Sequence, residues 1–130
     1  MALQGYLYTY FKNIKYGQDD QRIYFAISED GFHFNEINNH KPMIVSDRGT
    51  KALRDPHVFK NEIDGYYYIL ATDLDVNTNR WKQFKTNGSK DIFVARSKDL
   101  INWETEMARV CDESINSARV PRLTYWIRRR

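Results

Sequence analysis

A motif that occurs twice constrains the fold of this chain more than any other feature. Ile23–Phe34 and Ile92–Trp103 each contain an apolar strand, a Ser-x-Asp turn and a second strand that ends near an aromatic residue. Two tyrosine-rich segments, Gly5–Tyr8 and Gly65–Tyr68, precede these copies in the same order. The whole unit therefore repeats. Self-similarity at this period is typical of β-propeller blades or of another array of repeats.

The first unit, about residues 5–38, predicts three strands. Alternation along its opening segment places Tyr6, Tyr8 and Tyr10 on one face of the first strand and the intervening residues on the other. The polar segment 13–21 predicts a hairpin loop, and residues 38–52 a connector. The predicted strands are Gly5–Phe11, Ile23–Ser28 and Phe32–Ile37.

The second unit, about residues 54–106, predicts four strands and therefore a complete blade. It opens at Arg54-Asp55-Pro56, where the proline favours an extended conformation for Asp55. Residues 61–65 predict a turn and 73–90 a long polar loop, whereas residues 117–126 resemble the opening of a third unit. The predicted strands are His57–Lys60, Tyr66–Thr72, Ile92–Ser97 and a short outer strand around Asn102–Glu104.

Composition indicates one globular domain and says little about partners. The chain has 130 residues, of which 42% are hydrophobic and 28% charged, and its net charge of +3 equals the three arginines of 128–130. A single cysteine, Cys111, excludes an internal disulfide. We expect no membrane span and no signal peptide, which leaves a cytoplasmic or a processed secreted location open.

The order of five segments resembles the start of glycoside hydrolase family 43. The resemblance implies an all-β fold, a five-bladed propeller, and an enzyme that cleaves arabinose- or xylose-type linkages with inversion, usually in plant polysaccharides. Because this chain holds about two blades and the beginning of a third, the resemblance predicts an incomplete propeller. The matching segments are Tyr8–Phe11, Ile23–Gly31, Arg54–Pro56, Tyr68–Leu74 and Ile92–Trp103.

Inverting hydrolysis needs a carboxylic acid and a carboxylate base, about 6.5–9.5 Å apart. The resemblance implies a base Asp on a first innermost strand, a tuning Asp in Arg-Asp-Pro and an acid Glu in the third blade. Asp55 matches the tuning and orienting carboxylate, although it could instead only cap the turn before Pro56. No Asp precedes Gly5, and Arg122 occupies the expected position of the general acid, where a guanidinium cannot donate a proton usefully.

Candidate sugar-binding residues are Arg54, Asp73 and Trp81. Asp73 could line a sugar subsite or cap a turn, and Trp81 could stack on a sugar or hold its loop against the blade. Oxygen ligands alternate through Asp73–Asn79 as in a calcium loop, but the required Gly and Glu are missing, so a solvated loop is favoured. The histidines, His33, His40 and His57, lack metal-ligand spacing, and we expect neither a metal nor a cofactor.

Asp30 and Asp99 recur once in each unit, directly before a turn. A catalytic group is needed once, whereas a turn is needed in every blade. The repetition therefore predicts that both aspartates are structural.

Two functional hypotheses follow. The first is a glycosidase of the family 43 type, represented by an N-terminal portion that is inactive by itself through truncation or gene decay. The second is a noncatalytic carbohydrate-binding or vestigial blade array. Both imply a carbohydrate partner and neither implies a membrane or nucleic acid, the arginine-rich end being a remote third interpretation. Open blade edges favour self-association.

Overall fold

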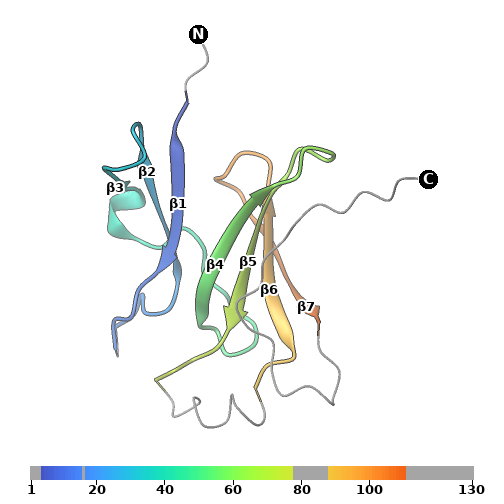
Figure 1. Cartoon of the computed structure of the whole chain (residues 1–130). Coiled ribbons are helices and arrows are strands. Elements are labelled where there is room, and N and C mark those ends of the chain that lie inside the picture. The colour runs from blue at the N-terminus through green and yellow to red at the C-terminus, as the bar shows by residue number, and fades with distance from the viewer. Residues whose placement is uncertain (1–3, 16, 78–87, 111–130) are drawn as a thin grey trace, which may run out of the picture.

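The computed structural model describes residues 4–15, 17–77 and 88–110, and this part of the chain is all-β. Its strands form two antiparallel sheets, in the orders β1-β2-β3 and β4-β5-β6-β7 (Figure 1). The predicted fold class, an incomplete set of propeller-type antiparallel blades, is confirmed. The elements are β1 Tyr6–Phe11, β2 Ile23–Ser28, β3 Asn35–Glu36, the 3₁₀ helix η1 Asn38–His40, β4 Leu53–Lys60, β5 Tyr67–Asp73, β6 Asp91–Ser97 and β7 Glu104–Arg109.

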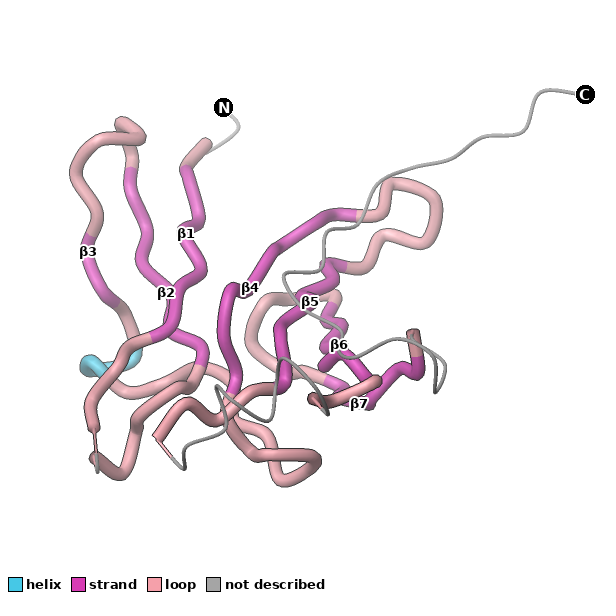
Figure 2. The backbone as a smooth tube through the Cα atoms, turned by 60° about the horizontal axis from the view of Figure 1, so that its bottom comes forward, coloured by secondary structure: helices cyan, strands magenta, loops and turns pink. Residues whose placement is uncertain are grey.

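The two sheets stand side by side, with β1 next to β4 (Figures 1 and 2). Their facing sides form one apolar core, because β2 contributes Ile23 and Phe25 while β5 and β6 contribute alternate residues. Complete burial of each large apolar side chain stabilises the fold by about 1.5–3 kcal/mol. The buried members of this core are Ile23, Phe25, Ile44, Leu53, Ile69, Ala71, Phe93 and Ala95. None of the described helices has the length and apolar character that a membrane crossing requires.

The alternation predicted for β1 is confirmed by its pairing with β2. Leu7 packs against the core, whereas Tyr6, Tyr8 and Tyr10 pair with residues on the opposite face of β2. The rings of Tyr8 and Tyr10 stack with centroids 5.2 Å apart, and Tyr10 stacks in turn on Tyr24. This second face of the first sheet is therefore a ladder of aromatic rings.

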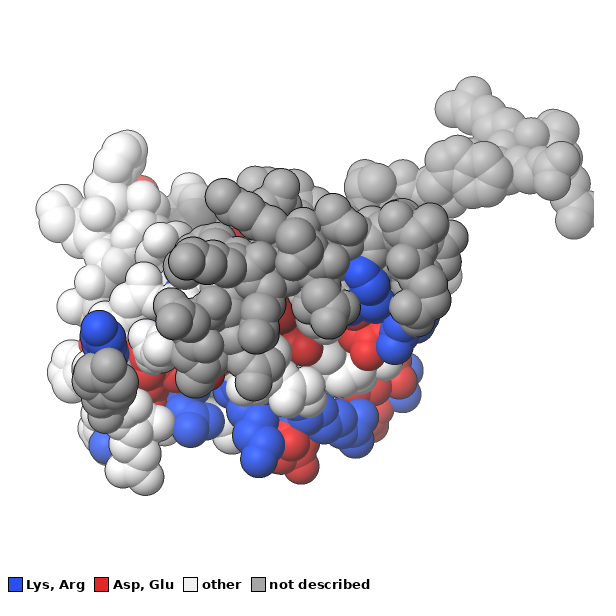
Figure 3. Space-filling model, turned by 90° about the horizontal axis from the view of Figure 1, so that it is seen from below, with Lys and Arg blue, Asp and Glu red and all other residues white. Residues whose placement is uncertain are grey.

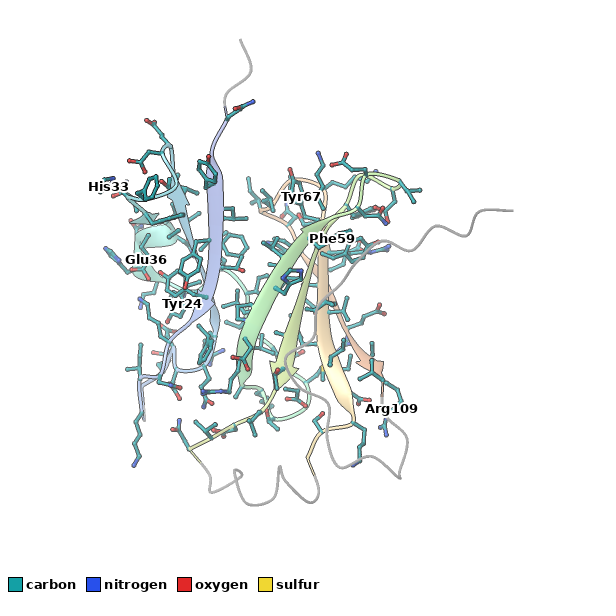
Figure 4. All side chains as sticks on the ribbon, viewed as in Figure 1. Tyr24, His33, Glu36, Phe59, Tyr67 and Arg109 are labelled. Carbon is teal, nitrogen blue, oxygen red and sulfur yellow. The ribbon has the colours of Figure 1, made fainter. Side chains whose placement is uncertain are left out.

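Glu36 joins that aromatic face to the loop after β1. Its carboxylate accepts hydrogen bonds from the Tyr10 hydroxyl and from His40, and it pairs with Lys12. The Lys12 contact is the largest cause that lowers the pKa of Glu36 to about 2. Tyr24 and Glu36 lie over the first sheet, away from β4 (Figure 4).

The two Ser-x-Asp turns have the same hydrogen bonds, which confirms that Asp30 and Asp99 are structural. In the first turn Asp30 accepts from the backbone of Phe32 and His33, both at 2.8 Å, and Ser28 Oγ donates to its carboxylate. In the second turn Asp99 accepts from the backbone of residues 101 and 102, and Ser97 Oγ donates to it. These donors lower the pKa of both aspartates.

Pairing registers show which strand the first sheet lacks. Tyr6 of β1 pairs with Ser28, and Tyr67 of β5 pairs with Ser97, so β1 corresponds to β5 and the missing strand corresponds to β4. The aromatic residue at the end of the second repeat also connects the two units. Trp103 packs edge-on against Phe25 of the preceding unit, with centroids 5.8 Å apart. A repeating array is the simplest arrangement with these contacts.

Three predicted strand bounds were wrong for identifiable reasons. β3 begins at Asn35 because the amides of residues 32 and 33 donate to Asp30 instead of to β2. For the same reason β7 begins at Glu104, and it then continues to Arg109. β4 begins at Leu53, before the Arg-Asp-Pro segment. The proposed unit bounds stay predictions, and residues 117–126 lie outside the described chain.

Replacing either turn serine should destabilise the protein by a similar amount. Ser28→Ala and Ser97→Ala each remove the acceptor for two backbone N–H groups beside a buried position, at a cost of about 1–3 kcal/mol. Urea unfolding measures this loss, and Glu29→Ala, on an exposed side chain of the same turn, is the control. An unchanged midpoint in both serine variants would contradict the structural role of the repeat.

The turns should also make the fold sensitive to acid. Because the pKa of Asp99 is lower in the folded protein, its stabilisation is complete above the unfolded pKa of about 3.9 and is lost as the pH falls below it. Asp99→Asn keeps an acceptor for both amides but cannot titrate. We expect a smaller loss of urea midpoint between pH 6 and pH 3 in this variant than in the wild type. Equal losses in the two proteins would exclude Asp99 as a source of the acid sensitivity.

Candidate active site

Asp55 lies on an irregularity of β4, not in an extended segment. Three steps along β4, from Arg54 to His57, match two steps along β5, from Thr72 to Leu70, so the ladder contains one extra residue. At this point Asp55 has φ 51°, in the left-handed region. The expectation that Pro56 holds Asp55 extended was therefore wrong. The bulge dominates because it must absorb the extra residue while pairing continues on both sides.

The backbone at Asp55 is strained, because a non-glycine residue occupies the left-handed region there. A non-glycine residue in this region costs about 1–3 kcal/mol, and such residues concentrate at functional sites. Aspartate tolerates the left-handed region better than most residues. Its side chain is exposed on the first strand of the second sheet. The bulge thus presents a carboxylate to solvent from a rigid sheet.

Arg54 joins the beginning of β4 to the end of β1 and to the loop that follows it. Its guanidinium donates to Asn13 Oδ1 at 2.7 Å and to Gln21 Oε1 at 3.2 Å. Its Cζ also lies 4.5 Å from the ring centroid of Phe11, at the end of β1. Partial burial lowers the pKa of Arg54, while the carboxylates of Asp55 and Asp20 act in the opposite direction. An arginine remains charged under these influences.

The residues around Arg54 form a hydrogen-bonded group that we name the junction cluster. It comprises Asn13, Asp20, Gln21, Arg54 and Asp75. The Gln21 amide donates to Asp20 at 3.0 Å and to Asp75 at 2.9 Å. The cluster therefore connects the loop after β1, the beginning of β4 and the loop after β5. Sequence analysis missed its centre, since one glutamine in a polar loop has no periodic signal.

Asp73 lies beneath the connector between the sheets, with 3% of its surface exposed. Its Oδ1 accepts from the Thr50 amide at 2.8 Å and from the Thr50 hydroxyl at 2.6 Å. Gly49 approaches the same carboxylate so closely that a Cβ would collide with it. These contacts hold the connector against the end of β5. The assignment of Asp73 to a sugar subsite stays a prediction.

The described part of the segment that resembles a calcium loop makes hydrogen bonds within the protein. Asp75 accepts from Gln21 and from the amide of Asn77, while the Asn77 side chain donates to Asp20. Among the described residues there is no group of three or more His, Cys, Asp or Glu arranged to hold a metal. Two predicted site residues, Trp81 and Arg122, lie outside the described residues.

Charges of both signs are present at this end of the molecule (Figure 3). Where described atoms are visible from below, Lys and Arg alternate with Asp and Glu and form no field of one sign (Figure 3). A hollow of about 670 Å³ lies at the Ser28–Asp30 turn, between Tyr6 and Leu100. Another of about 350 Å³ lies over Tyr68. Neither includes Asp55, Arg54 or Asp73. Of these three residues only Arg54 belongs to the junction cluster, while Asp55 follows it in β4 and Asp73 is bonded to Thr50.

Comparison with known proteins shows the family of this chain. Residues 2–128 match the model of a family related to glycoside hydrolase family 43 and described as "Probable glycosyl hydrolase domain". The match covers nearly the whole chain.

Two curated relatives are similar over shorter segments. An "Alpha-L-arabinofuranosidase" of Bifidobacterium longum is 32% identical over 99 residues, which are 76% of this chain and 9% of that protein. A "1,2-beta-oligomannan phosphorylase" of a Thermoanaerobacter species is 31% identical over 90 residues, which are 69% of this chain and 27% of that protein. The chain thus matches only a minor part of each relative.

The approach of Gly49 to Asp73 predicts a large effect of one added methyl group. Gly49 and Gly65 both have positive φ, so alanine should cost about 1–2 kcal/mol at either position. Gly65→Ala meets no atom within 4 Å, whereas Gly49→Ala meets the Asp73 carboxylate. We expect a further loss of about 1–3 kcal/mol in Gly49→Ala, measured by urea unfolding. Equal losses in the two variants would refute the close contact.

Proposed function

Because this chain belongs to a glycosyl hydrolase family related to glycoside hydrolase family 43, we propose that it recognises arabinofuranosides or xylosides. In this proposal the sugar binds beside Asp55, at the junction cluster. Asp55 orients the sugar and tunes the catalytic acid, and Arg54 donates to sugar hydroxyls. The single observation that carries the proposal is the exposed, strained position of Asp55 next to an arginine fixed by both sheets.

The contacts of Arg54 support its proposed role. A guanidinium has five N–H donors, and the bonds to Asn13 and Gln21 both use Nη1. These bonds fix the plane of the group beside Asp55. Hydroxyl groups of a furanose or pyranose are suitable acceptors, and a fixed donor loses less entropy on binding than a mobile one.

The proposed chemistry needs groups besides Asp55. Inverting hydrolysis uses an acid on the leaving oxygen and a base that activates water on the opposite side of the sugar. The carboxylates of Asp20, Asp73 and Asp75 accept hydrogen bonds from protein groups. We therefore assign these carboxylates to support of the site. In this proposal Asp73 lines the sugar subsite, and Trp81 stacks on the sugar. In this proposal Arg122 stands where a general acid is expected.

It follows that the 130-residue chain alone should bind sugar without cleaving it. Completion of the site requires carboxylates from neighbouring blades of a closed ring, in the same polypeptide or in an assembled partner. Self-association would cover the free edge of β1, where the second sheet has β4 at the corresponding place. It would also cover the ladder of Tyr6, Tyr8 and Tyr10. A noncatalytic carbohydrate-binding role is the second candidate, favoured by the absence of a free acid–base pair among the described members of the junction cluster.

Calorimetric titration with arabinobiose and xylobiose tests binding, and release of nitrophenol from the corresponding chromogenic glycosides tests turnover. We expect saturable binding of one disaccharide and no turnover above background. Asp55→Asn keeps the tolerance for the left-handed backbone but removes the charge, and should weaken binding about 10-fold. The matched control is Asp47→Asn, an exposed carboxylate on the connector.

Each other outcome has a defined meaning. Turnover by the isolated chain would contradict the inactive-portion proposal and support a complete catalytic site. No binding of either disaccharide would sink the proposed specificity, and binding of 1,2-β-mannobiose alone would replace it. Equal affinities of the Asp55 variant and the wild type would remove Asp55 from the site. Light scattering on the same samples reports self-association.

A further inference from the structure

The Gln21 side chain makes four hydrogen bonds in the described structure. Its Nε2 donates to Asp20 and Asp75, and its Oε1 accepts from Arg54 Nη1 at 3.2 Å and from the Val76 amide at 3.1 Å. An amide side chain has two donors and two acceptor lone pairs, so its capacity is filled. Only 2% of its surface is exposed.

The backbone of Gln21 is fixed as firmly as its side chain. Its amide donates to the Lys12 carbonyl at 2.8 Å, and its carbonyl accepts from the Leu53 amide at 2.7 Å. Its φ of 51° lies in the left-handed region, which costs free energy for a residue with a side chain. The left-handed backbone and the burial of a polar amide both cost free energy of folding at Gln21, and the hydrogen bonds of the amide offset this cost.

No other side chain of similar size could make these four bonds. A glutamate would keep the acceptors for Arg54 and Val76 but would place a third carboxylate beside Asp20 and Asp75. A methionine would fill the volume without any of the bonds. The amide is therefore matched to two carboxylates on one side and to the Arg54 guanidinium on the other.

We propose that Gln21 is a positioning residue, which fixes the Arg54 guanidinium beside Asp55 and thereby controls sugar affinity at the junction cluster. This inference rests on the proposed function. The effect passes through Arg54, because Gln21 Oε1 is a buried acceptor of its guanidinium, whereas Asn13 is an exposed one. The same amide sets the beginning of the loop after β5, through Asp75 and Val76.

The test compares Gln21→Met with the wild type, using Ser97→Ala as a control destabilised at a distant turn. Nitrogen-15 NMR of the Arg54 guanidinium should show a resolved, exchange-protected signal in the wild type and in Ser97→Ala, and none in Gln21→Met. Calorimetry with the disaccharide that the wild type binds should show about 10-fold weaker binding for Gln21→Met and unchanged binding for Ser97→Ala. Wild-type affinity in folded Gln21→Met overturns the inference.

Coupling separates positioning from a general structural role. As a single substitution, Arg54→Lys should weaken sugar binding. In a Gln21→Met background its effect should be much smaller, because both changes remove the same fixed guanidinium. Additive effects would overturn the inference. Should Gln21→Met fail to fold, Gln21→Glu decides, because it keeps the acceptor for Arg54. In Gln21→Glu the protected Arg54 signal and the wild-type sugar affinity should either both persist or both disappear. Loss of one without the other would overturn the inference.

The NMR measurement keeps this inference separable from the proposed function. If the wild type binds none of the sugars, the proposed function fails. The Arg54 signal then still shows whether Gln21 orders the guanidinium. Its persistence in Gln21→Met would refute the positioning role regardless of any sugar.

Discussion

The packing of the two sheets against each other is the constraint on which the rest of the structure depends. The first sheet has three strands and the second has four, and the described core lies mainly between them. A sheet with one apolar face must bury it against another element, so each sheet needs the apolar face of the other. This packing places the end of β1 beside the beginning of β4. Arg54 can reach Phe11, Asn13 and Gln21 for that reason.

The junction cluster has the opposite character to the core. The core is apolar and tolerates changes that conserve volume, whereas each polar atom of the cluster depends on a particular partner. Gln21 and Asp55 both have left-handed backbones, and both lie where the sheets meet. Strain at two neighbouring positions requires support from the surrounding fold. The repeated turns also use left-handed positions, Gly31 and Leu100, but these follow the aspartates and serve the turn itself.

The repeat also accounts for what is unusual about the surface. The first sheet packs one face against the second sheet, and the aromatic ladder lies on its other face. Tyr6 and Tyr8 on this ladder are more than half exposed. The chain as a whole belongs to a glycosyl hydrolase family.

The sequence by itself determined the all-β class, the strand order, the faces of β1 and the structural role of Asp30 and Asp99. These features follow from alternation and from short-range turns, which involve residues close in the chain. Only the tertiary structure decided that Asp55 sits on a left-handed bulge, that Asp73 is buried under Thr50 and that Gln21 joins three segments. Such features depend on contacts between residues 13 to 55 positions apart, from His57 with Leu70 to Gln21 with Val76, and no local pattern encodes them.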